Sequence, residues 1–171
     1  MDLDEVYQLY VNDLYRYLFS LSKDHYTAED LVQEAFYRAY IHLEDYEISN
    51  IKAWLFKVAY HAFIDFTRKK KRVTLSDSIQ EKVQDNQFIV KTPEKQLLEK
   101  ESFFTLMDDI HSLKESERNV LILCDLHQLT LKEAAEILNL NINTLKSHLI
   151  RGRRKVIERV KERRKQDEGR K

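Results

Sequence analysis

Glycine, proline and cysteine are scarce in this chain of 171 residues, which holds two Gly, one Pro and one Cys. Phosphate-binding loops and dinucleotide-binding turns need several closely spaced glycines, so neither can form from two glycines near the C-terminus. A single cysteine, Cys124, excludes an intrachain disulfide, and its place in the apolar run from Val120 to Leu126 predicts a core position. Few turn residues and many helix formers predict an all-α protein.

Long hydrophobic runs and a basic leader are also missing. No apolar stretch approaches the roughly 18 residues of a membrane-spanning helix, and the N-terminus is acidic. The six histidines, at positions 25, 42, 61, 111, 127 and 148, have no zinc-site spacing to cysteine or carboxylates. We therefore expect a cytoplasmic protein that is not an enzyme and has no metal or cofactor.

The two signs of charge are separated along the chain, although 29 acidic and 29 basic residues cancel overall. Residues 1–66 carry a net charge of −7, and residues 96–142 carry −5. In contrast, residues 67–72 carry +5 and residues 143–171 carry +8. Two basic segments in acidic surroundings are typical of a protein that binds nucleic acid.

The segment from Leu129 to Lys155 has the pattern of a helix-turn-helix. Thr130 and Glu133 have the spacing of a capping box, which predicts a helix start. Asn139 tolerates left-handed backbone, and Asn141 can cap a second helix. The apolar face of the first helix would consist of Leu131, Ala134, Ala135 and Leu138.

The second helix of this motif would carry polar and basic side chains over a buried seam. Leu145 and Leu149 are expected to face inward. The side chains expected on the exposed side are Lys146, Ser147, His148 and Arg151. Such donors suit base edges and phosphates. An ordinary helical hairpin with a solvated basic face would show the same pattern.

Three further amphipathic helices are predicted upstream. The first covers about residues 3–21, the second is expected to be capped by Thr27, and the third covers about residues 51–70 after a polar loop at 44–50. The positions expected to face inward are Val6, Leu9, Tyr10, Leu14, Tyr17, Leu18 and Leu21 in the first helix, Leu31, Ala35, Phe36, Ala39, Tyr40 and Leu43 in the second, and Leu55, Val58, Ala59, Ala62 and Phe66 in the third.

Residues 73–93 lose the helical periodicity and end at the only proline, Pro93. A loop of about 20 residues is unusual inside one compact domain, so we expect a flexible linker between two small helical domains. The domains would cover residues 1–72 and 94–171. In the second domain, helices near 94–113 and 116–127 would precede the helix-turn-helix.

One face of the third helix combines an aromatic ring with cations. Trp54, Lys57, His61 and Arg68 share this face, and Tyr46 lies in the loop before it. Single-stranded nucleic acid binds such surfaces because bases stack on aromatic rings and phosphates pair with cations. The same pattern would arise if Trp54 covered the core and the cations ended a solvated helix, so both interpretations stay open.

Three segments, in this order and at this separation, resemble the extracytoplasmic-function group of bacterial sigma factors. They are the segment from Thr27 to Tyr40, which contains the pattern Asp-x-x-Gln-Glu-x-Phe, the segment from Trp54 to Ala59, and the helix-turn-helix. The resemblance covers about residues 4–160. It implies a region-two and a region-four domain, both all-α, and an alternative sigma factor that directs core RNA polymerase to promoters and helps melt them.

The resemblance also implies contacts. The positions that match the polymerase-binding surface are Asp30, Gln33 and Glu34. Those that match the surface for the minus-ten strand are Tyr46, Trp54, Lys57, His61 and Arg68. Those that match the minus-thirty-five reading helix are Lys146, Ser147, His148 and Arg151, followed by Arg153, Arg154 and Lys155 toward phosphates. Family members are often held inactive by a membrane-linked anti-sigma factor.

Departures from the family pattern limit what the resemblance implies about promoter sequence. His61 stands where many relatives have Asn, and Lys146 and His148 stand where relatives often have Arg. Lysine cannot make the two-pronged contact of arginine with guanine.

An alternative function is a helix-turn-helix regulator that binds operator DNA without polymerase. Dependence on core polymerase distinguishes a sigma factor from such a regulator.

Overall fold

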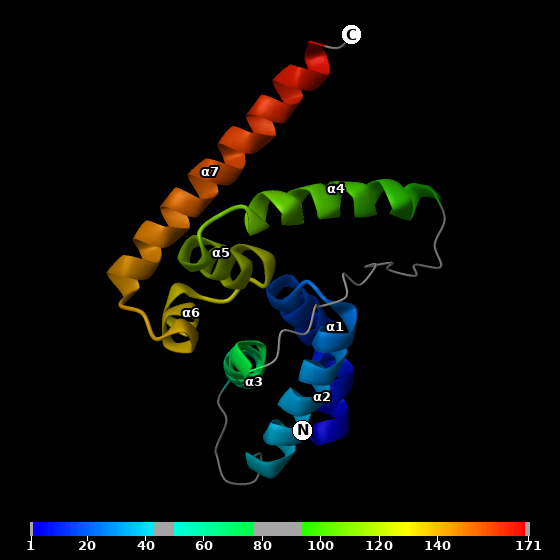
Figure 1. Cartoon of the computed structure of the whole chain (residues 1–171), viewed down its shortest axis with the longest axis vertical. Coiled ribbons are helices and arrows are strands. Elements are labelled where there is room, and N and C mark those ends of the chain that lie inside the picture. The colour runs from blue at the N-terminus through cyan, green and yellow to red at the C-terminus, as the bar shows by residue number, and fades with distance from the viewer. Residues whose placement is uncertain (1, 43–49, 77–93, 170–171) are drawn as a thin grey trace. The chain divides into compact units, whose positions relative to one another are not determined.

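The computed structural model describes residues 2–42, 50–76 and 94–169, and all regular elements in these ranges are helical. The elements are α1 (Leu3–Ser22), α2 (His25–His42), α3 (Ile51–Ser76), α4 (Glu94–His111), α5 (Glu115–Leu121), the π-helix η1 (Ile122–Leu126), α6 (Leu131–Leu138) and α7 (Ile142–Glu168), shown in Figure 1. The chain divides into two compact units, Met1–Ile89 and Val90–Lys171. The predicted all-α fold is confirmed.

Helix α1 begins and ends with local hydrogen bonds. The Asp2 carboxylate accepts the backbone N–H of Glu5 at 2.9 Å, and the Glu5 carboxylate accepts the N–H of Asp2 at 3.3 Å. This capping box satisfies two amide groups that a helix start leaves without partners. The helix ends at Ser22, and Lys23 follows as the C-cap with left-handed backbone (φ 58°) while its N–H donates to the carbonyl of Phe19 at 2.8 Å.

The predicted cap of α2 at Thr27 is wrong. The helix begins at His25, and Asp24, three residues before Thr27, provides the capping carboxylate. That carboxylate accepts the backbone N–H of Thr27 at 3.1 Å and its hydroxyl at 2.6 Å. Thr27 therefore donates to the cap instead of forming it, because a carboxylate three residues upstream accepts from its amide.

Helices α1, α2 and α3 each pack against the other two. The rings of Tyr17 and Phe56 lie at the centre of this unit, fully buried and with centroids 4.9 Å apart. The buried apolar residues are Val6, Leu14, Tyr17 and Leu18 in α1, Ala28, Leu31, Val32, Ala35, Phe36 and Ala39 in α2, and Leu55, Phe56, Ala59 and Ala62 in α3. Most of the predicted inward positions are confirmed.

The remaining predicted inward positions lie nearer the solvent. Leu9 is 58% exposed and Tyr40 is 67% exposed, so their predicted burial is wrong. Four other predicted inward positions are half-buried instead of buried, namely Tyr10, Leu21, Val58 and Phe66. Within this unit the described part of each helix packs mainly against two others, so the edges of its apolar stripe stay uncovered. Phe56, which was not predicted, fills the centre. Leu43 and residues 44–49 of the loop predicted at 44–50 lie outside the described residues.

Helix α3 continues past the predicted start of the linker. Residues 73–76 are helical, which corrects the expectation of a linker from residue 73. Residues 77–93 lie outside the described ranges.

In the described ranges no helix combines the length and apolar character needed to cross a membrane.

In the second unit, α5 and α6 pack against α7, and α4 packs against α5 and α7 (Figure 1). The predicted helix at 116–127 begins at Glu115 and ends as η1, where the N–H of His127 donates to the carbonyl of Ile122 at 3.1 Å. The buried apolar residues are Met107, Ile110, Leu113, Val120, Leu121, Ile122, Leu123, Leu129, Ala134, Ala135, Ile137, Leu145 and Leu149.

Cys124 is half-buried, not a core residue as predicted. Partial burial still disfavours the thiolate, and the carboxylate of Asp125 adds to this effect. Together they raise the pKa of the Cys124 thiol to about 11. The thiol therefore stays protonated at neutral pH, and its reactivity is low.

Candidate nucleic-acid interface

The helix-turn-helix forms with the predicted caps. The Thr130 hydroxyl accepts the N–H of Glu133 at 3.1 Å, and the Glu133 carboxylate accepts the N–H of Thr130 at 3.0 Å. Asn139 has left-handed backbone, with φ 54°, and ends α6. The side chain of Asn141 accepts the N–H of Asn143 at 2.8 Å and begins α7. Local capping thus sets the short turn between the two helices.

Helix α7 is held in the motif by its apolar seam. Leu145 is fully buried and Leu149 is 4% exposed, as predicted. In α6 the seam consists of Ala134, Ala135 and Ile137, whereas Leu131 and Leu138 are only half-buried, which corrects the predicted apolar face. Burial of this seam fixes the rotation of α7 about its axis, and therefore decides which of its polar side chains face solvent.

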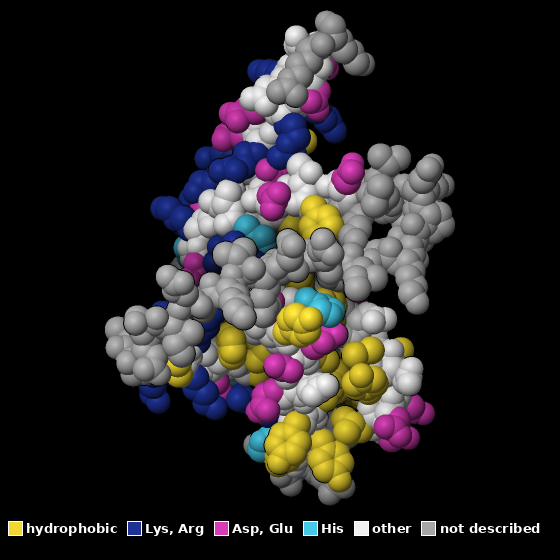
Figure 2. Space-filling model, turned by 45° about the vertical axis from the view of Figure 1, so that its right-hand side comes forward, with side chains coloured by type: hydrophobic (Ala, Val, Ile, Leu, Met, Phe, Trp, Pro, Cys, Tyr) yellow, Lys and Arg dark blue, Asp and Glu magenta, His cyan; other side chains and the backbone are white. Residues whose placement is uncertain are grey.

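The polar side chains of the N-terminal half of α7 lie opposite this seam. Lys146, Ser147 and Arg151 are exposed, and His148 is half-buried. The Ser147 hydroxyl donates to the carbonyl of Asn143 at 3.1 Å, so its donor is used within the helix. Figure 2 shows Lys and Arg side chains gathered along this long helix. The exposed set forms a donor-rich surface that suits a polyanion.

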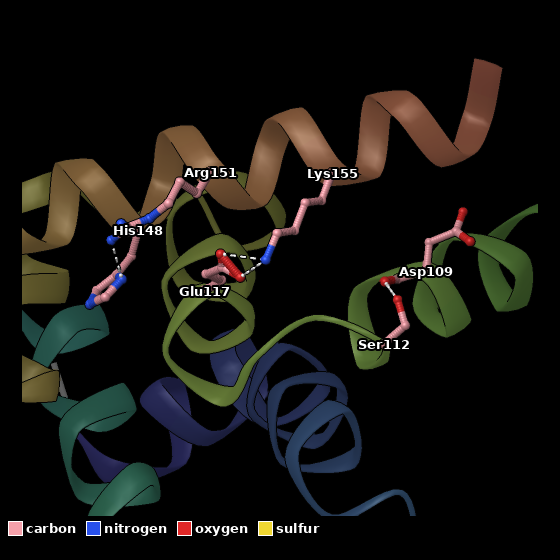
Figure 3. Close-up of polar contacts among 6 residues, drawn as sticks. All are labelled: Asp109, Ser112, Glu117, His148, Arg151 and Lys155. Carbon is pink, nitrogen blue, oxygen red and sulfur yellow. Dashed lines mark hydrogen bonds and ion pairs between the residues drawn. The ribbon is translucent and has the colours of Figure 1, made fainter. Parts of the chain in front are cut away.

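Arg151 and His148 contact each other on this surface. The guanidinium nitrogen Nη2 of Arg151 lies 3.2 Å from Nδ1 of His148 (Figure 3). Because arginine can only donate, the hydrogen bond requires the neutral imidazole with Nδ1 as acceptor. The contact uses one donor of Arg151 and leaves its other donors for a ligand.

The cations that follow Arg151 differ in their partners. Arg153 donates to both oxygens of Asp125, at 2.6 and 2.9 Å, and this paired hydrogen bond raises the pKa of the Arg153 guanidinium further. Lys155 donates to both oxygens of Glu117, at 2.6 and 3.1 Å. Arg154 is exposed, and it forms no ion pair with the residues whose side chains are described, 2–42, 50–73 and 101–169. Of the three cations predicted to contact phosphates, two are thus engaged within the protein.

Glu117 lies beneath α7 and holds this helix by charge and by close packing. Its side chain is 3% exposed, and the hydrogen bond from Lys155 lowers the pKa of its carboxyl (Figure 3). Helix α7 crosses α5 at Gly152, which is buried. A Cβ at position 152 would lie 3.4 Å from the carbonyl oxygen of Glu117. Farther along, Arg163 donates to the buried Asp109 at 2.5 Å. These contacts align α7 along α4 and α5.

The predicted aromatic and basic face of α3 is only partly accessible. His61 and Arg68 are exposed, whereas Trp54 and Lys57 are half-buried. Asn50 begins the helix by accepting the N–H of Ala53 at 3.1 Å. Half-burial of Trp54 leaves part of its ring for stacking and part for the core. Tyr46 lies outside the described residues.

The acidic face of α2 is exposed as predicted, since Asp30, Gln33 and Glu34 all face solvent. Arg38, which the sequence interpretation missed, donates to Glu34 at 3.0 Å and to Asp65 of α3 at 2.9 Å. The four-residue spacing from Glu34 to Arg38 is a local signal of this pair. No local signal indicates the contact with Asp65.

Comparison with known proteins assigns both units. The family model described as Sigma-70 region 2 matches residues 6–73, and Sigma-70 region 4 matches residues 105–156. The extracytoplasmic-function (ECF) RNA polymerase sigma factor SigM of Bacillus subtilis is 44% identical over 157 residues, which cover 91% of this chain and 93% of SigM. SigW of the same organism is 29% identical over 87% of this chain and 83% of SigW.

Solved structures show the same fold. The sigma factor RpoE from Bartonella quintana, solved with the anti-sigma factor NepR, is 27% identical with a TM-score of 0.74, over 92% of this chain and 96% of RpoE. CnrH, solved with the cytosolic domain of CnrY, is similar in fold, with a TM-score of 0.66 at 18% identity over 93% of this chain and 87% of CnrH. The two family matches and the relation to SigM show that this chain belongs to the extracytoplasmic-function group of the sigma-70 family.

Proposed function

We propose that this chain acts as an alternative sigma factor through three surfaces that direct core RNA polymerase to promoters. The observation that carries the proposal is the helix-turn-helix in which α7 presents exposed Lys146, Ser147 and Arg151 over a buried seam. Region 2 upstream of this motif favours a sigma factor over a regulator that binds operator DNA alone. The proposed domains are residues 1–72, extended by the helical residues to Ser76, and residues 94–171.

The α2 face would bind core RNA polymerase. Asp30, Gln33 and Glu34 are exposed on one side of the helix, at the spacing that brings side chains together. Glu34→Lys reverses a charge on this face, so we expect weaker binding to core polymerase in a titration. Asp13→Lys makes the same charge change on α1 and serves as the matched control. Equal affinities of the two variants would contradict the assignment.

The α3 face would hold the melted minus-ten strand. Exposed His61 and Arg68 would contact the strand, and Lys57 and the accessible part of Trp54 would complete the surface. Stacking on an aromatic ring and pairing with phosphates would stabilise the melted strand on this face. Tyr46, predicted for the same surface, stays a prediction.

The N-terminal half of α7 would contact the minus-thirty-five element. Recognition helices contact base edges near their N-terminus, where Lys146, Ser147, His148 and Arg151 lie, while later cations contact phosphates. Lys146→Ala is expected to cost about 1–3 kcal/mol at one or two base positions. Arg154→Ala is expected to weaken all sequences alike and to flatten the salt dependence by about one unit of slope.

Run-off transcription with purified core polymerase and genomic fragments tests the whole proposal. We expect transcripts only when core and this chain are both present. Binding of the chain alone to duplex operator DNA with the affinity and specificity of the holoenzyme would instead support the alternative regulator. A factor that acts with core polymerase would work in the cytoplasm, where bacterial transcription takes place, and would leave the chemistry to polymerase.

An anti-sigma factor is a proposed further partner. RpoE of Bartonella quintana, 27% identical, was solved in complex with one. A pull-down with this chain as bait tests for such a partner. That the partner is linked to the membrane stays a prediction.

A further inference from the structure

Four of the five residues from Arg151 to Lys155 are cations. In the structure two of them are exposed without an ion pair to a described residue, and two form ion pairs within the protein. Arg151 and Arg154 are exposed, and within the described ranges neither has an acidic partner in hydrogen-bond or ion-pair contact. Arg153 and Lys155 are paired with Asp125 and Glu117. The acids come from η1 and α5, so this division is a product of the packing of these elements against α7.

The pair of Arg153 and Asp125 lies at the surface. The side chains are 50% and 34% exposed, and the contact is two-pronged, with N–O distances of 2.6 and 2.9 Å. Two parallel hydrogen bonds between guanidinium and carboxylate hold both groups in one plane. Arg153 could otherwise reach a phosphate, because its side chain is long and half of it is accessible.

The position of Arg153 on α7 makes this pairing relevant to DNA. Arg153 follows Lys146 by seven residues, which is close to two helical turns, so both side chains project from nearly the same side of α7. The distance between them along the axis is about 10 Å. A cation at this distance from a base-contacting residue would lie near the phosphates that flank the same site.

We propose that Asp125 is a specificity-determining residue that retains Arg153 within the protein and so limits sequence-independent affinity for DNA. The inference rests on the proposed contact of α7 with the minus-thirty-five element. A phosphate contact that strengthens binding to every duplex equally leaves the ratio of specific to non-specific binding unchanged, so the ratio falls only if the specific complex gains less. We expect the specific complex to gain less, because its base contacts fix α7 in the groove, whereas a non-specific complex can shift to meet the released Arg153.

Asp125→Asn tests the proposal, because the amide keeps the shape of the side chain and removes its charge. We expect the holoenzyme to bind scrambled duplex more tightly, with a salt slope about 0.9 units steeper, which corresponds to an extra fall of about threefold in affinity between about 50 and 200 mM salt. Binding to the promoter duplex should improve less. The discrimination between the two duplexes should fall.

The double variant Asp125→Asn, Arg153→Gln separates this mechanism from simple loss of repulsion between Asp125 and phosphates. If Arg153 carries the gain, the double variant returns to the slope of Arg153→Gln alone. If Asp125→Asn steepens the slope equally in both backgrounds, the proposal is wrong. A fall of about one unit of slope in Arg153→Gln alone would also overturn it, because Arg153 would then contact phosphate in the parent.

Two control variants separate failure of this inference from failure of the proposed function. Lys146→Gln and Arg154→Gln remove exposed cations without known acidic partners among the described residues. Unchanged promoter binding in both would reject the contact of α7 with DNA. Weaker binding in both, together with an unchanged slope in Asp125→Asn, would reject only the role of Asp125. Thermal unfolding of each variant shows whether the fold is retained.

Discussion

The ion pair between Glu117 and Lys155 makes a measurable contribution to the stability of the second unit. Lys155→Met removes the ammonium group and keeps most of the aliphatic chain. The Glu117 side chain is 3% exposed, so its carboxylate cannot exchange the lost partner for water, whereas Lys155 is 43% exposed and partly screened. Hydrogen bonds to charged groups contribute about 1.5–3 kcal/mol to the free energy of unfolding. Because solvent partly screens Lys155, we expect Lys155→Met to lose about 2 kcal/mol, in the lower half of this range.

Urea unfolding at neutral pH, followed by circular dichroism, measures this loss. Hydrogen exchange of the α5 and α7 amides assigns it to the second unit, while the fluorescence of Trp54 reports on the first unit and should not change. Arg154→Met is the matched control on the same helix, because it removes an exposed cation and should change stability by less than about 0.5 kcal/mol. A loss in Lys155→Met no larger than that of the control would refute the reasoning.

The same pair predicts a pH dependence. The hydrogen bond from Lys155 lowers the pKa of Glu117 in the folded state, so the folded carboxyl binds fewer protons than the unfolded one. The stabilisation is therefore complete above the ordinary glutamate pKa of about 4.3 and is lost as the pH falls through the lower folded value. The difference between parent and Lys155→Met should shrink as the pH falls below about 4.3, and a difference that stays constant down to the acid limit of the folded state would contradict this assignment.

Three other predictions concern separate positions. Trp54→Ala should reduce permanganate reactivity of promoter thymines, since stacking contributes about 1–3 kcal/mol per base, and Trp54→Phe should restore part of it at unchanged thermal stability. Gly152→Ala should stabilise α7 by up to about 1 kcal/mol, because its Cβ makes only ordinary contacts, whereas Gly152→Leu should destabilise by about 1–3 kcal/mol through overpacking against Glu117. Cys124 should react with iodoacetamide near pH 8 about 100-fold more slowly than the unfolded thiol, because its pKa is raised to about 11; equal rates would contradict its burial.

Local signals in the sequence predicted the helix-turn-helix. Its capping box joins Thr130 and Glu133, three residues apart, and Asn139 and Asn141 act within their own turn. Such interactions depend on side-chain chemistry and short-range backbone geometry, so they can be recognised without the fold. The start of α2 shows where this fails, because the sequence analysis chose Thr27 as the cap, whereas Asp24 provides it in the structure.

Burial was predicted well at the centre of each apolar stripe and poorly at its edges. The central residues, such as Leu14 and Leu145, are buried whichever neighbour a helix finds. Edge residues such as Leu9 and Tyr40 are covered only if a neighbouring helix crosses at the right angle, and here none does within the described residues. Periodicity defines the direction of the apolar face but not its covered width.

The amino-acid sequence by itself determined the helical composition, the caps of the helix-turn-helix and the family. Only the tertiary structure decided which cations of α7 stay available for DNA. Arg153 pairs with a residue 28 positions away and Lys155 with one 38 positions away. Neither contact leaves a trace in local spacing, because each depends on how α7 is rotated and aligned against α5 and η1, which burial of the shared core sets.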